Sequence, residues 1–571
     1  MTIIKDSDRP RGPSMGVLRK KMVIGEDLGP YLRKWIPISI LVGTVAGFGA
    51  VIFQYALEGI WHISYESFAI PWYLILFIPA LGGLLAGVII NQWAPETAGS
   101  GTDHVINSVH HRGGRIRGRV VPVKLAASAL TIGSGGSSGN EGPISQISGG
   151  IASFIGTRLR LSRSEMRILV ISGMAAGWSA VFRAPLGSAI FAIEVPYKND
   201  MESSAVVPSI VSSITSYLVF IPFGGTGPLF SSDVPEVSID AGLLAVVLLL
   251  GLMIGLVGIA FVLIMKNMQQ VFRRSMLPLP AATFIGGLGV GVIGLAYPQV
   301  LGLGEGTINI LLEGTMLTLG FVAVLILVKI VATSLTVGSG GSGGIFFPSL
   351  IVGGCVGSAL ALGLGLQPYA LFVLVGMGAM MAGVSKTPIA ASVLMTEMVG
   401  GFAILIPLMI ASTVSYLVTG KYSLFDAQLT SGKMGVDYST LGDVKVKDIM
   451  SPSPVAIDVN SSTDMIVHTV HGSPHKIYPV TENGKVVGII SRRMIEEGNM
   501  KDDLFPSILQ KEFQRIAQDS SAADAFELMV SRKVSVIIVV DSLEENNLTG
   551  VLTRIDVLQK VEHLDEGHLE Y

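Results

Sequence analysis

Apolar segments of very different lengths follow one another from about residue 35 to residue 420. A helix needs roughly 20 apolar residues to cross the hydrocarbon core of a bilayer. The segments long enough to do so alone include residues 38–57, 72–90, 243–265 and 321–337. Residues 35–430 are therefore predicted to form an all-α polytopic membrane domain.

Two shorter apolar runs, residues 144–155 and 345–356, each begin directly after a cluster of glycines. The clusters read GSGGSSGNEGP (residues 133–143) and GSGGSGGIFFP (residues 338–348). We expect each run to form a half-helix that crosses only part of the membrane. Interrupted segments at corresponding places in two halves indicate inverted repeats, here at about 35–225 and 240–430.

The glycine clusters themselves carry a functional signal. In hydrocarbon, a non-helical segment leaves backbone N–H groups unpaired, and it is tolerated only where it lines a protein cavity or a water path. Each cluster ends at a proline that suits the first turn of a helix. Two helix N-termini aimed at one cavity would present free N–H groups and partial positive charge to an anion. The pattern thus indicates an anion pathway, with close helix packing through glycine as the alternative.

A nucleotide-binding loop explains the glycines less well. Gly338, Gly340 and Gly343 satisfy G-x-G-x-x-G, but no strand precedes them and no acidic residue follows at about 20 positions. Neither cluster is a P-loop, because no Lys-Ser/Thr pair closes it.

Composition and charge agree with a membrane protein. Half of the 571 residues are hydrophobic, 14% are charged, and the mean hydropathy is +0.61. The single cysteine, Cys355, excludes a disulfide framework and is expected in the core. A charged stretch, residues 1–34, precedes the first apolar segment, so no secretory signal is expected there.

Basic residues gather in four stretches, which the positive-inside rule assigns to the cytoplasm. These stretches are residues 9–34, 112–124, 158–167 and 266–274. They place both termini in the cytoplasm, and this topological role explains "HHRGGRIRGR" better than binding to nucleic acid does.

The composition changes after about residue 430. Two soluble units of the same order, helix–strand–turn–strand–helix, occupy about residues 443–500 and 505–565. In the first, β-prone runs at 477–480 and 486–490 flank the turn "ENGK". We therefore expect a tandem α+β module in residues 431–571, after the membrane domain.

Four motifs of the membrane part resemble the CLC family of chloride channels and chloride/proton antiporters. They are "GSG" at 99–101, "GNEGP" at 139–143, "GIFFP" at 344–348 and "FRAPLGSAIFAIEV" at 182–195. The C-terminal module resembles a pair of cystathionine-β-synthase (CBS) domains. The two resemblances cover nearly the whole chain and imply a membrane domain of full and half helices followed by a CBS pair.

The CLC resemblance implies a set of chloride-binding groups and a gate. The Ser100 hydroxyl and backbone amides of the glycine motifs would hold chloride, and a pore tyrosine would fall on Tyr422. The gating glutamate of the family falls on Glu141, whose carboxylate could occupy the anion position and leave it on protonation. The remaining positions implied for chloride binding are Gly142, Ile345, Phe346 and Phe347.

Three residues depart from the family pattern. Asp103 stands where the family usually has proline, and an acid there should repel anions unless it is paired. Asn140 replaces the commoner basic residue before Glu141. Val195 stands where antiporters commonly carry a second, proton-accepting glutamate, although its neighbour Glu194 matches a widely shared acid.

Val195 favours passive, Glu141-gated chloride conduction over secondary active chloride/proton exchange, which stays open as the second hypothesis. A third is a divalent-cation carrier or a membrane enzyme, since CBS pairs accompany such proteins too. No H-E-x-x-H occurs among the nine histidines. The membrane acids Glu141, Glu194 and Glu397 are scattered, whereas a magnesium pathway needs clustered ones. We therefore expect neither an enzyme nor a bound metal.

The resemblance to CBS domains raises the question of an adenine-nucleotide sensor. In "GVLTRID", Thr553 and Asp556 match the family's ribose-contacting residues. In "GIISRRM", Ser491 is kept but Met494 replaces the acid, so at most one nucleotide site is expected. The alternative is a purely structural dimerisation module. The CLC resemblance further implies a homodimer with one pore per subunit and no required cofactor.

Overall fold

The structure is a computed structural model of the 571-residue chain. It describes residues 28–66, 71–230, 239–314, 317–430, 441, 444–473, 475–497, 509–532 and 534–557. Most of the expected N-terminal cytoplasmic segment therefore lies outside the described residues, as do the ends of the second soluble unit. The chain divides into a membrane unit, residues 1–432, and a soluble unit, residues 433–571.

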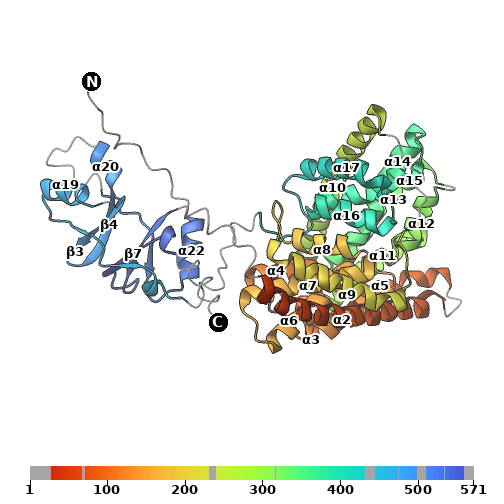
Figure 1. Cartoon of the computed structure of the whole chain (residues 1–571), viewed down its shortest axis with the longest axis horizontal. Helices are drawn as coiled ribbons and strands as arrows, with labels where there is room; N and C mark the ends of the chain where they lie inside the picture. The colour runs from red at the N-terminus through yellow and green to blue at the C-terminus, as the bar shows by residue number, and fades with distance from the viewer. Residues whose placement is uncertain are drawn as a thin grey trace, which may run out of the picture. The chain divides into compact units, whose positions relative to one another are not determined.

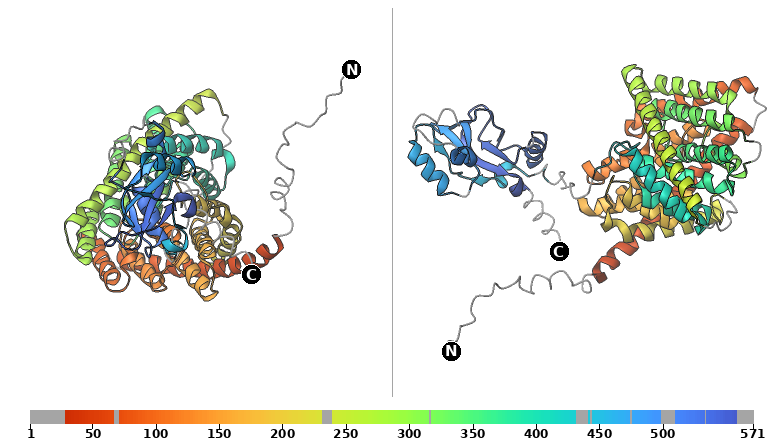
Figure 2. Two further views of the ribbon diagram at one scale, coloured as in Figure 1. Left: turned by 90° about the vertical axis from the view of Figure 1, so that its left-hand side faces the viewer. Right: turned by 90° about the horizontal axis from the view of Figure 1, so that it is seen from above.

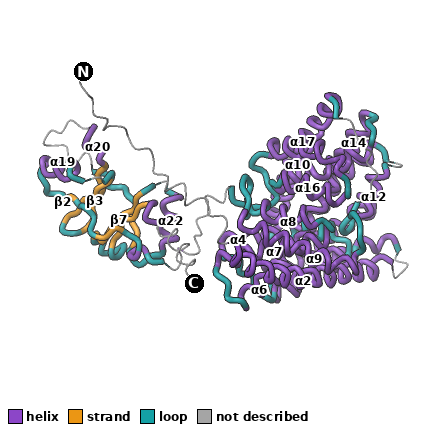
Figure 3. Tube along the Cα trace, in the orientation of Figure 1, coloured by secondary structure: helices purple, strands orange, loops and turns teal. Residues whose placement is uncertain are grey.

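The membrane unit is built from helices, as Figure 3 shows. Its first half contains α2 (Leu28–Trp61), α3 (Ile78–Trp93), α4 (Gly101–His111), α5 (Val120–Gly133), α6 (Glu141–Arg158), α7 (Arg163–Phe182), α8 (Pro185–Glu194) and α9 (Val206–Gly224). Its second half contains α10 (Ala241–Arg274), α11 (Leu279–Ala296), α12 (Glu305–Glu313), α13 (Leu319–Gly338), α14 (Phe346–Leu364), α15 (Tyr369–Ser385), α16 (Pro388–Val399) and α17 (Leu405–Thr419). Among the described residues, nine helical segments are long and apolar enough to cross a membrane.

The two halves lie against one another, with α2–α9 on one side of the unit and α10–α17 on the other (Figures 1 and 2). The same helix contacts recur in each. A Cβ atom on Gly43 would come within 2.5 Å of the Ser212 carbonyl, and one on Gly251 within 2.9 Å of the Ala411 carbonyl. Glycine therefore lets α2 approach α9, and α10 approach α17, by the same small-residue packing.

Buried polar contacts repeat as well. Lys124 donates to the Thr97 carbonyl and Lys329 to the Val300 carbonyl, each over 3.0 Å. Each of these lysines stands nine residues before a GSGG sequence. Because both the sequence order and the contacts repeat, the predicted inverted-repeat architecture is confirmed.

The short helices α8 and α16 cap one another, each through a glutamate near its end. Each begins with a proline at its N-terminus and ends near a glutamate. Glu194 accepts hydrogen bonds from the Ile389 and Ala390 amides (3.3 and 2.6 Å) at the start of α16. Glu397 accepts from the Leu186 and Gly187 amides (3.2 and 2.7 Å) at the start of α8. Each carboxylate satisfies N–H groups that a helix start leaves open.

Three boundaries differ from the sequence prediction. Helices α6 and α14 run on to Arg158 and Leu364, so they are longer than the predicted half-helices, and α14 is long enough to span. Small residues such as Gly357 and polar ones such as Thr157 weaken the apolar signal without ending the helix. The predicted segment 72–90 is broken at Phe77, because Pro79 begins a new helix.

The soluble unit contains two small sheets with helices, in agreement with the predicted tandem α+β module (Figure 3). Its elements are β1 (Ser451–Pro452), β2 (Ile457–Asp458), α19 (Thr463–His471), β3 (Ile477–Glu482), β4 (Lys485–Ser491), α20 (Arg492–Glu497), β5 (Arg515–Ala517), α22 (Ala522–Ser531), β6 (Val536–Val540) and β7 (Leu548–Thr553). The sheet orders are β2-β3-β4 and β1-β7-β6-β5. Asn483 and Gly484 both have positive φ at the β3–β4 turn, as a two-residue hairpin requires.

Candidate functional site: a buried carboxylate where three helices begin

The two glycine segments lie side by side in the middle of the membrane unit. The Gly139 amide donates to the Gly344 carbonyl (2.9 Å), and the Gly344 amide donates to the Gly139 carbonyl (2.7 Å). Segments from opposite halves of the sequence are therefore joined by a reciprocal pair of backbone hydrogen bonds.

Three helix N-termini meet at this junction. Helices α6 and α14 begin directly after the bridge, and α4 begins at Gly101. A Cβ on Gly101 would lie 2.2 Å from the Gly142 carbonyl oxygen, and one on Gly142 would lie 2.9 Å from Gly344 Cα. Only glycine permits this approach, which gathers three sets of open amide groups in one place.

Glu141, the first residue of α6, places its side chain at the start of α14. The residue is 2% exposed, and its Oε1 accepts a hydrogen bond from the Phe346 amide (2.5 Å). Its Oε2 is buried and has no hydrogen-bond partner among the described residues. A Cβ on Gly139 or Gly344 would lie within 2.0 Å of a carboxylate oxygen. The two glycines thus leave room for an anionic group at a helix N-terminus.

A cavity of about 440 Å³, here the Ser100 cavity, adjoins the junction. Its lining consists of Ala98, Gly99, Ser100, Asp103, His104, Gln269, Phe272, Arg273, Leu277, Leu279, Ala282, Val337, Gly338, Ser339, Gly340, Ile345, Leu424 and Asp426. The Ser100 hydroxyl is buried without a partner among the described residues. A buried hydroxyl without a partner is costly unless something else bonds it, so Ser100 is suited to bind a ligand in this cavity.

Charged groups of both signs surround the Ser100 cavity, whose lining includes the carboxylates of Asp103 and Asp426. The Lys124 ammonium is fully buried and donates to the Thr97 and Gly99 carbonyls (3.0 and 2.9 Å), directly behind Ser100. Arg273 lines the cavity. His104 also lines it, and its Nε2 is 3.1 Å from the Ala98 carbonyl oxygen.

The other predicted chloride-binding residues lie at different distances from the cavity. Ile345 lines it, and the Phe346 amide is bonded to Glu141. The Phe346 and Phe347 rings pack against Phe182, with centroids 4.8 and 6.3 Å away. Tyr422 is half-buried, with the Lys421 ammonium 5.7 Å from its ring, and the cavity is lined by Leu424 and Asp426 of the same segment instead.

Val195, Glu194 and Asn140, the other positions that the sequence analysis singled out, are all buried. Val195 is 0% exposed, and its carbonyl accepts from the Gln428 side-chain amide (2.8 Å). Glu194 points the other way, onto the start of α16. Asn140 is 1% exposed and its Oδ1 is without a partner among the described residues. The side chain of Val195 offers no group that could hold a proton.

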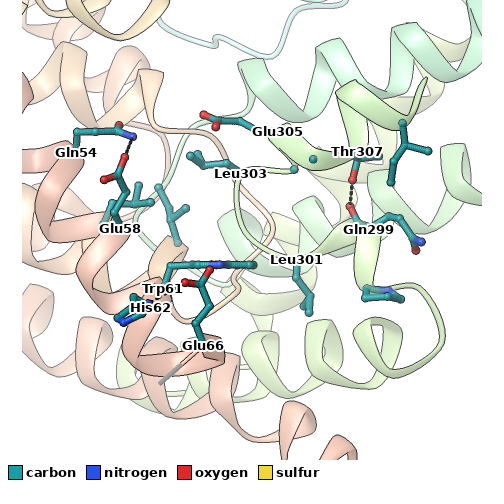
Figure 4. A pocket seen from close by; sticks show the side chains of 16 residues that line it. Gln54, Glu58, Trp61, His62, Glu66, Gln299, Leu301, Leu303, Glu305 and Thr307 are labelled. Atoms are coloured by element: carbon teal, nitrogen blue, oxygen red, sulfur yellow. Dashed lines mark hydrogen bonds and ion pairs between the residues drawn. The ribbon is translucent and has the colours of Figure 1, made fainter. Parts of the chain in front are cut away.

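A second cavity, here the Glu305 cavity, has a volume of about 700 Å³. It is lined by Gln54, Leu57, Glu58, Trp61, His62, Glu66, Ile132, Pro298, Gln299, Leu301, Leu303, Gly304, Glu305, Gly306, Thr307 and Ile310. Figure 4 shows the side chains of Glu58, Glu66 and Glu305 around it, with Gln54 bonded to Glu58. The cavity is therefore acidic.

In the soluble unit, the predicted nucleotide-binding residues are bonded locally. The Thr553 hydroxyl donates to Asp556 Oδ2 (2.8 Å), and the Asp556 amide donates to the Thr553 hydroxyl (3.2 Å). The Ser491 hydroxyl accepts from the Met494 amide (3.4 Å). Thr553 and Asp556 thus lie close enough to bond one sugar. Among the described residues, no three His, Cys, Asp or Glu side chains form a group that could hold a metal ion.

Sequence reasoning missed several residues of the site. Lys124 and Lys329 could have been found, because a lone lysine in an apolar run recurs at the same distance from GSGG in both halves. Leu424 and Asp426 had no such signal. The contact between Asp103 and the segment that holds them joins residues more than 300 positions apart.

Two inverted halves, with helix N-termini that meet at a buried carboxylate, define a membrane transport protein of the inverted-repeat class. Residues 82–420 match the model of the family described as voltage gated chloride channel, and residues 446–497 and 507–563 match that of the CBS domain. The chain belongs to the voltage gated chloride channel family and carries a CBS pair.

Individual relatives agree with this assignment. The putative chloride channel protein ClcB-like of Ralstonia nicotianae is 28% identical, over 70% of this chain and 97% of the relative. The H(+)/Cl(-) exchange transporter ClcA of Salmonella paratyphi B is 29% identical, over 66% and 85%. A solved CLC-type fluoride/proton antiporter is 25% identical over 70% of this chain and 98% of that one, with a TM-score of 0.62. The chain is thus an integral, multi-pass membrane protein.

Proposed function

We propose that this protein moves chloride passively across a membrane through a pore gated by Glu141. The observation that carries the proposal is the carboxylate of Glu141 at the N-terminus of α14, bonded to the Phe346 amide. A carboxylate at that position competes with chloride for the same donors. When it is protonated or displaced, the amides become available to the ion.

Chloride would be held by neutral donors rather than by a full charge. These are the Ser100 hydroxyl and the amides at the starts of α6 and α14, at Gly142, Ile345, Phe346 and Phe347. Helix N-termini contribute roughly half an elementary charge each, which attracts an anion without trapping it. Tyr422 remains a candidate pore residue that would need to move to reach the ion.

Passive movement is favoured by the buried, non-ionisable side chain of Val195, which cannot relay a proton to Glu141. Chloride/proton exchange is the second candidate, because several relatives are H(+)/Cl(-) exchange transporters and the solved relative is a fluoride/proton antiporter. Exchange would require a different proton route, such as a file of water molecules.

The basic ends of the helices support an orientation with both termini in the cytoplasm. Arg273 and Arg274 end α10, and Arg158 ends α6. By the positive-inside rule these ends face the cytoplasm, so the Ser100 cavity, which Arg273 lines, would be the cytoplasmic mouth.

We also propose a homodimer. Large apolar side chains are exposed on the short helices and their neighbours, including Leu186 on α8, Leu218 on α9, Ile389 on α16 and Leu417 on α17. The CBS pair is proposed to bind an adenine nucleotide through Thr553 and Asp556. The corresponding site of the first unit keeps Ser491 but lacks the acid, so it is expected to contribute little. Chloride transport itself is expected to need no cofactor.

The test is simultaneous measurement of chloride and proton flux in vesicles that contain the purified protein. For the wild type we expect chloride flux, and a chloride gradient that drives no uphill proton movement. Glu141→Gln should keep chloride flux, at an equal or higher rate, and remove its dependence on pH. Glu313→Gln, an exposed glutamate on α12, is the control and should behave as the wild type.

Uphill proton movement in the wild type would instead establish exchange, and Glu141→Gln should then abolish the coupling. Fluoride and nitrate gradients in the same assay define the anion preference. If no anion moved in the wild type, the proposed transport function would be wrong.

A further inference from the structure

The segment that follows α17, residues 420–430, is fastened to several parts of the membrane unit. The Leu424 amide donates to the Val384 carbonyl (2.9 Å) at the end of α15. The Gln428 side-chain amide donates to the carbonyls of Val195 and Ser385 (2.8 and 2.7 Å). The segment is therefore held in one conformation although it contains no helix or strand.

This segment forms a wall of the Ser100 cavity through Leu424 and Asp426. Ser100 itself lies at the start of α4 on another wall. The width of the cavity at the serine thus depends on how the segment is held against α4.

Asp103, in the first turn of α4, makes that connection. Its Oδ1 accepts a hydrogen bond from the Ala427 amide (2.9 Å), which lies between cavity residue Asp426 and the anchored Gln428. A second attachment lies beside it, where the Lys266 ammonium is 2.5 Å from Asp426 Oδ1. That ion pair is solvent-exposed and therefore weak. The Asp103 bond is partly buried, so water weakens it less.

An acid in the lining of an anion cavity should repel the ion, so Asp103 needs a reason to be there. The Asp103 carboxylate accepts from the Ala427 amide, and the Lys266 and Arg273 side chains on α10 offset the two negative charges of Asp103 and Asp426. The residue therefore provides attachment without making the cavity acidic.

We propose that Asp103 is a positioning residue, which clamps residues 424–428 to α4 and so sets the affinity of the Ser100 cavity for the transported anion. The affinity part of this inference rests on the proposed chloride transport, whereas the clamp itself does not. A plain alternative is that Asp103 is an ordinary acid in a first helical turn, where its charge favours the helix.

Two substitutions separate these explanations. Asp103→Asn keeps an oxygen that can accept from the Ala427 amide but removes the charge, whereas Asp103→Ala removes both. If the clamp matters, only the alanine variant fails. If the charge matters, both variants change alike.

The matched control is Asp240, which caps α10 by accepting from the Leu243 amide (2.7 Å). Asp240 does not line the Ser100 cavity. Asp240→Ala removes a bond of the same chemistry at another place, so it should lower thermal stability and leave the chloride KM unchanged.

The transport experiment measures the chloride dependence of flux in vesicles of full-length protein. We expect Asp103→Ala to raise the chloride KM about tenfold, which corresponds to about 1.4 kcal/mol. The maximum rate should change less than the KM, and Asp103→Asn should stay within about twofold of the wild type. An equal loss in both Asp103 variants, or a wild-type KM in the alanine variant, would overturn the proposal.

Hydrogen exchange of the purified full chain tests the clamp independently of transport. Amides of residues 424–428 should exchange at least about tenfold faster in Asp103→Ala than in the wild type, and at the wild-type rate in Asp103→Asn. Unchanged exchange in Asp103→Ala would refute the clamp. A wild type that moves no anion would refute the proposed function and the affinity role, and the exchange data would still decide whether Asp103 holds the wall.

Discussion

The Ser100 cavity and the Glu305 cavity occupy corresponding places in the two halves of the membrane unit, but their linings differ: the first contains Ser100 and charges of both signs, and the second is acidic. The loops that carry them, "APETAGSGTDH" from residue 94 and "YPQVLGLGEGT" from residue 297, align without a gap. Each contacts the glycine segment of the opposite copy in the same way. The Gly99 amide donates to the Gly340 carbonyl (3.3 Å), and the Gly302 amide donates to the Gly135 carbonyl (3.0 Å).

The side chains on and beside this shared backbone differ. Leu303 stands in place of Ser100, which removes the hydroxyl donor. Helices α2 and α10 differ in the same way. Glu58 lies fifteen residues after Gly43 in α2, and Lys266 lies fifteen residues after the equivalent Gly251 in α10. The Glu305 cavity therefore has an acid at the position where the second half has a cation.

The difference separates what the fold needs from what anion binding needs. Buried backbone groups must be satisfied in both halves, so their hydrogen bonds recur. The proposed function needs anion donors in the Ser100 cavity only, and the other cavity is lined by acidic side chains (Figure 4). Substitutions of shared residues should therefore affect stability alike, whereas substitutions of diverged residues should affect transport in one half alone.

The largest effect is expected from making the Ser100 cavity resemble its counterpart. Ser100→Leu removes a donor and fills the cavity with an apolar side chain. Chloride flux in vesicles should fall on the order of 100-fold, equivalent to about 2.7 kcal/mol. The converse change, Leu303→Ser, should leave flux within about twofold of the wild type. Equal losses in the two variants would mean that both cavities bind the ion.

The buried lysines test the shared part of the comparison. Lys124→Met and Lys329→Met each remove a buried donor, from the Thr97 carbonyl and from the Val300 carbonyl, at about 1–3 kcal/mol, and relief from burying a charge offsets part of this. Both variants should lower the melting temperature of the purified protein by about 2–5 °C.

Their effects on chloride flux should differ. Lys124 also holds the Gly99 carbonyl beside Ser100, so Lys124→Met is expected to slow flux about tenfold, or by about 1.4 kcal/mol. Lys329→Met should not slow it. A large loss of stability in one variant only would contradict the symmetric role of the pair.

How far the sequence predicts this structure depends on the range of each interaction. Helical spans, the two halves and the paired glycine segments follow from local patterns, because Gly and Pro allow few alternatives in a membrane. The sequence also places Glu141 at a helix start. It does not show that the Glu141 carboxylate reaches the Phe346 amide, 205 positions away, which depends on how the halves pack.

Long-range contacts also explain why the sequence did not identify the cavity-lining residues of the segment after α17. The resemblance to the CLC family makes Tyr422 the candidate pore tyrosine of this segment. The wall of the Ser100 cavity is instead set by the attachments of Gln428 and Ala427 to distant elements. In the sequence, Asp103 appears as an unpaired acid that would repel an anion. Its partner, the Ala427 amide, is 324 positions away along the chain and cannot be found from local patterns.

The smallest effect is expected from the acidic side chains of the Glu305 cavity. Glu305→Gln combined with Glu58→Gln removes two negative charges, which raises the local anion concentration on that side. At about 10 mM ionic strength the screening length is roughly 30 Å, and chloride flux should rise by up to about twofold. At about 0.15 M the length is roughly 8 Å, and the effect should vanish. Flux measured at both salt concentrations tests whether these carboxylates act only through long-range electrostatics. A gain that survives high salt would place these carboxylates on the ion path itself, and the Glu305 cavity would then be a second mouth rather than a diverged counterpart.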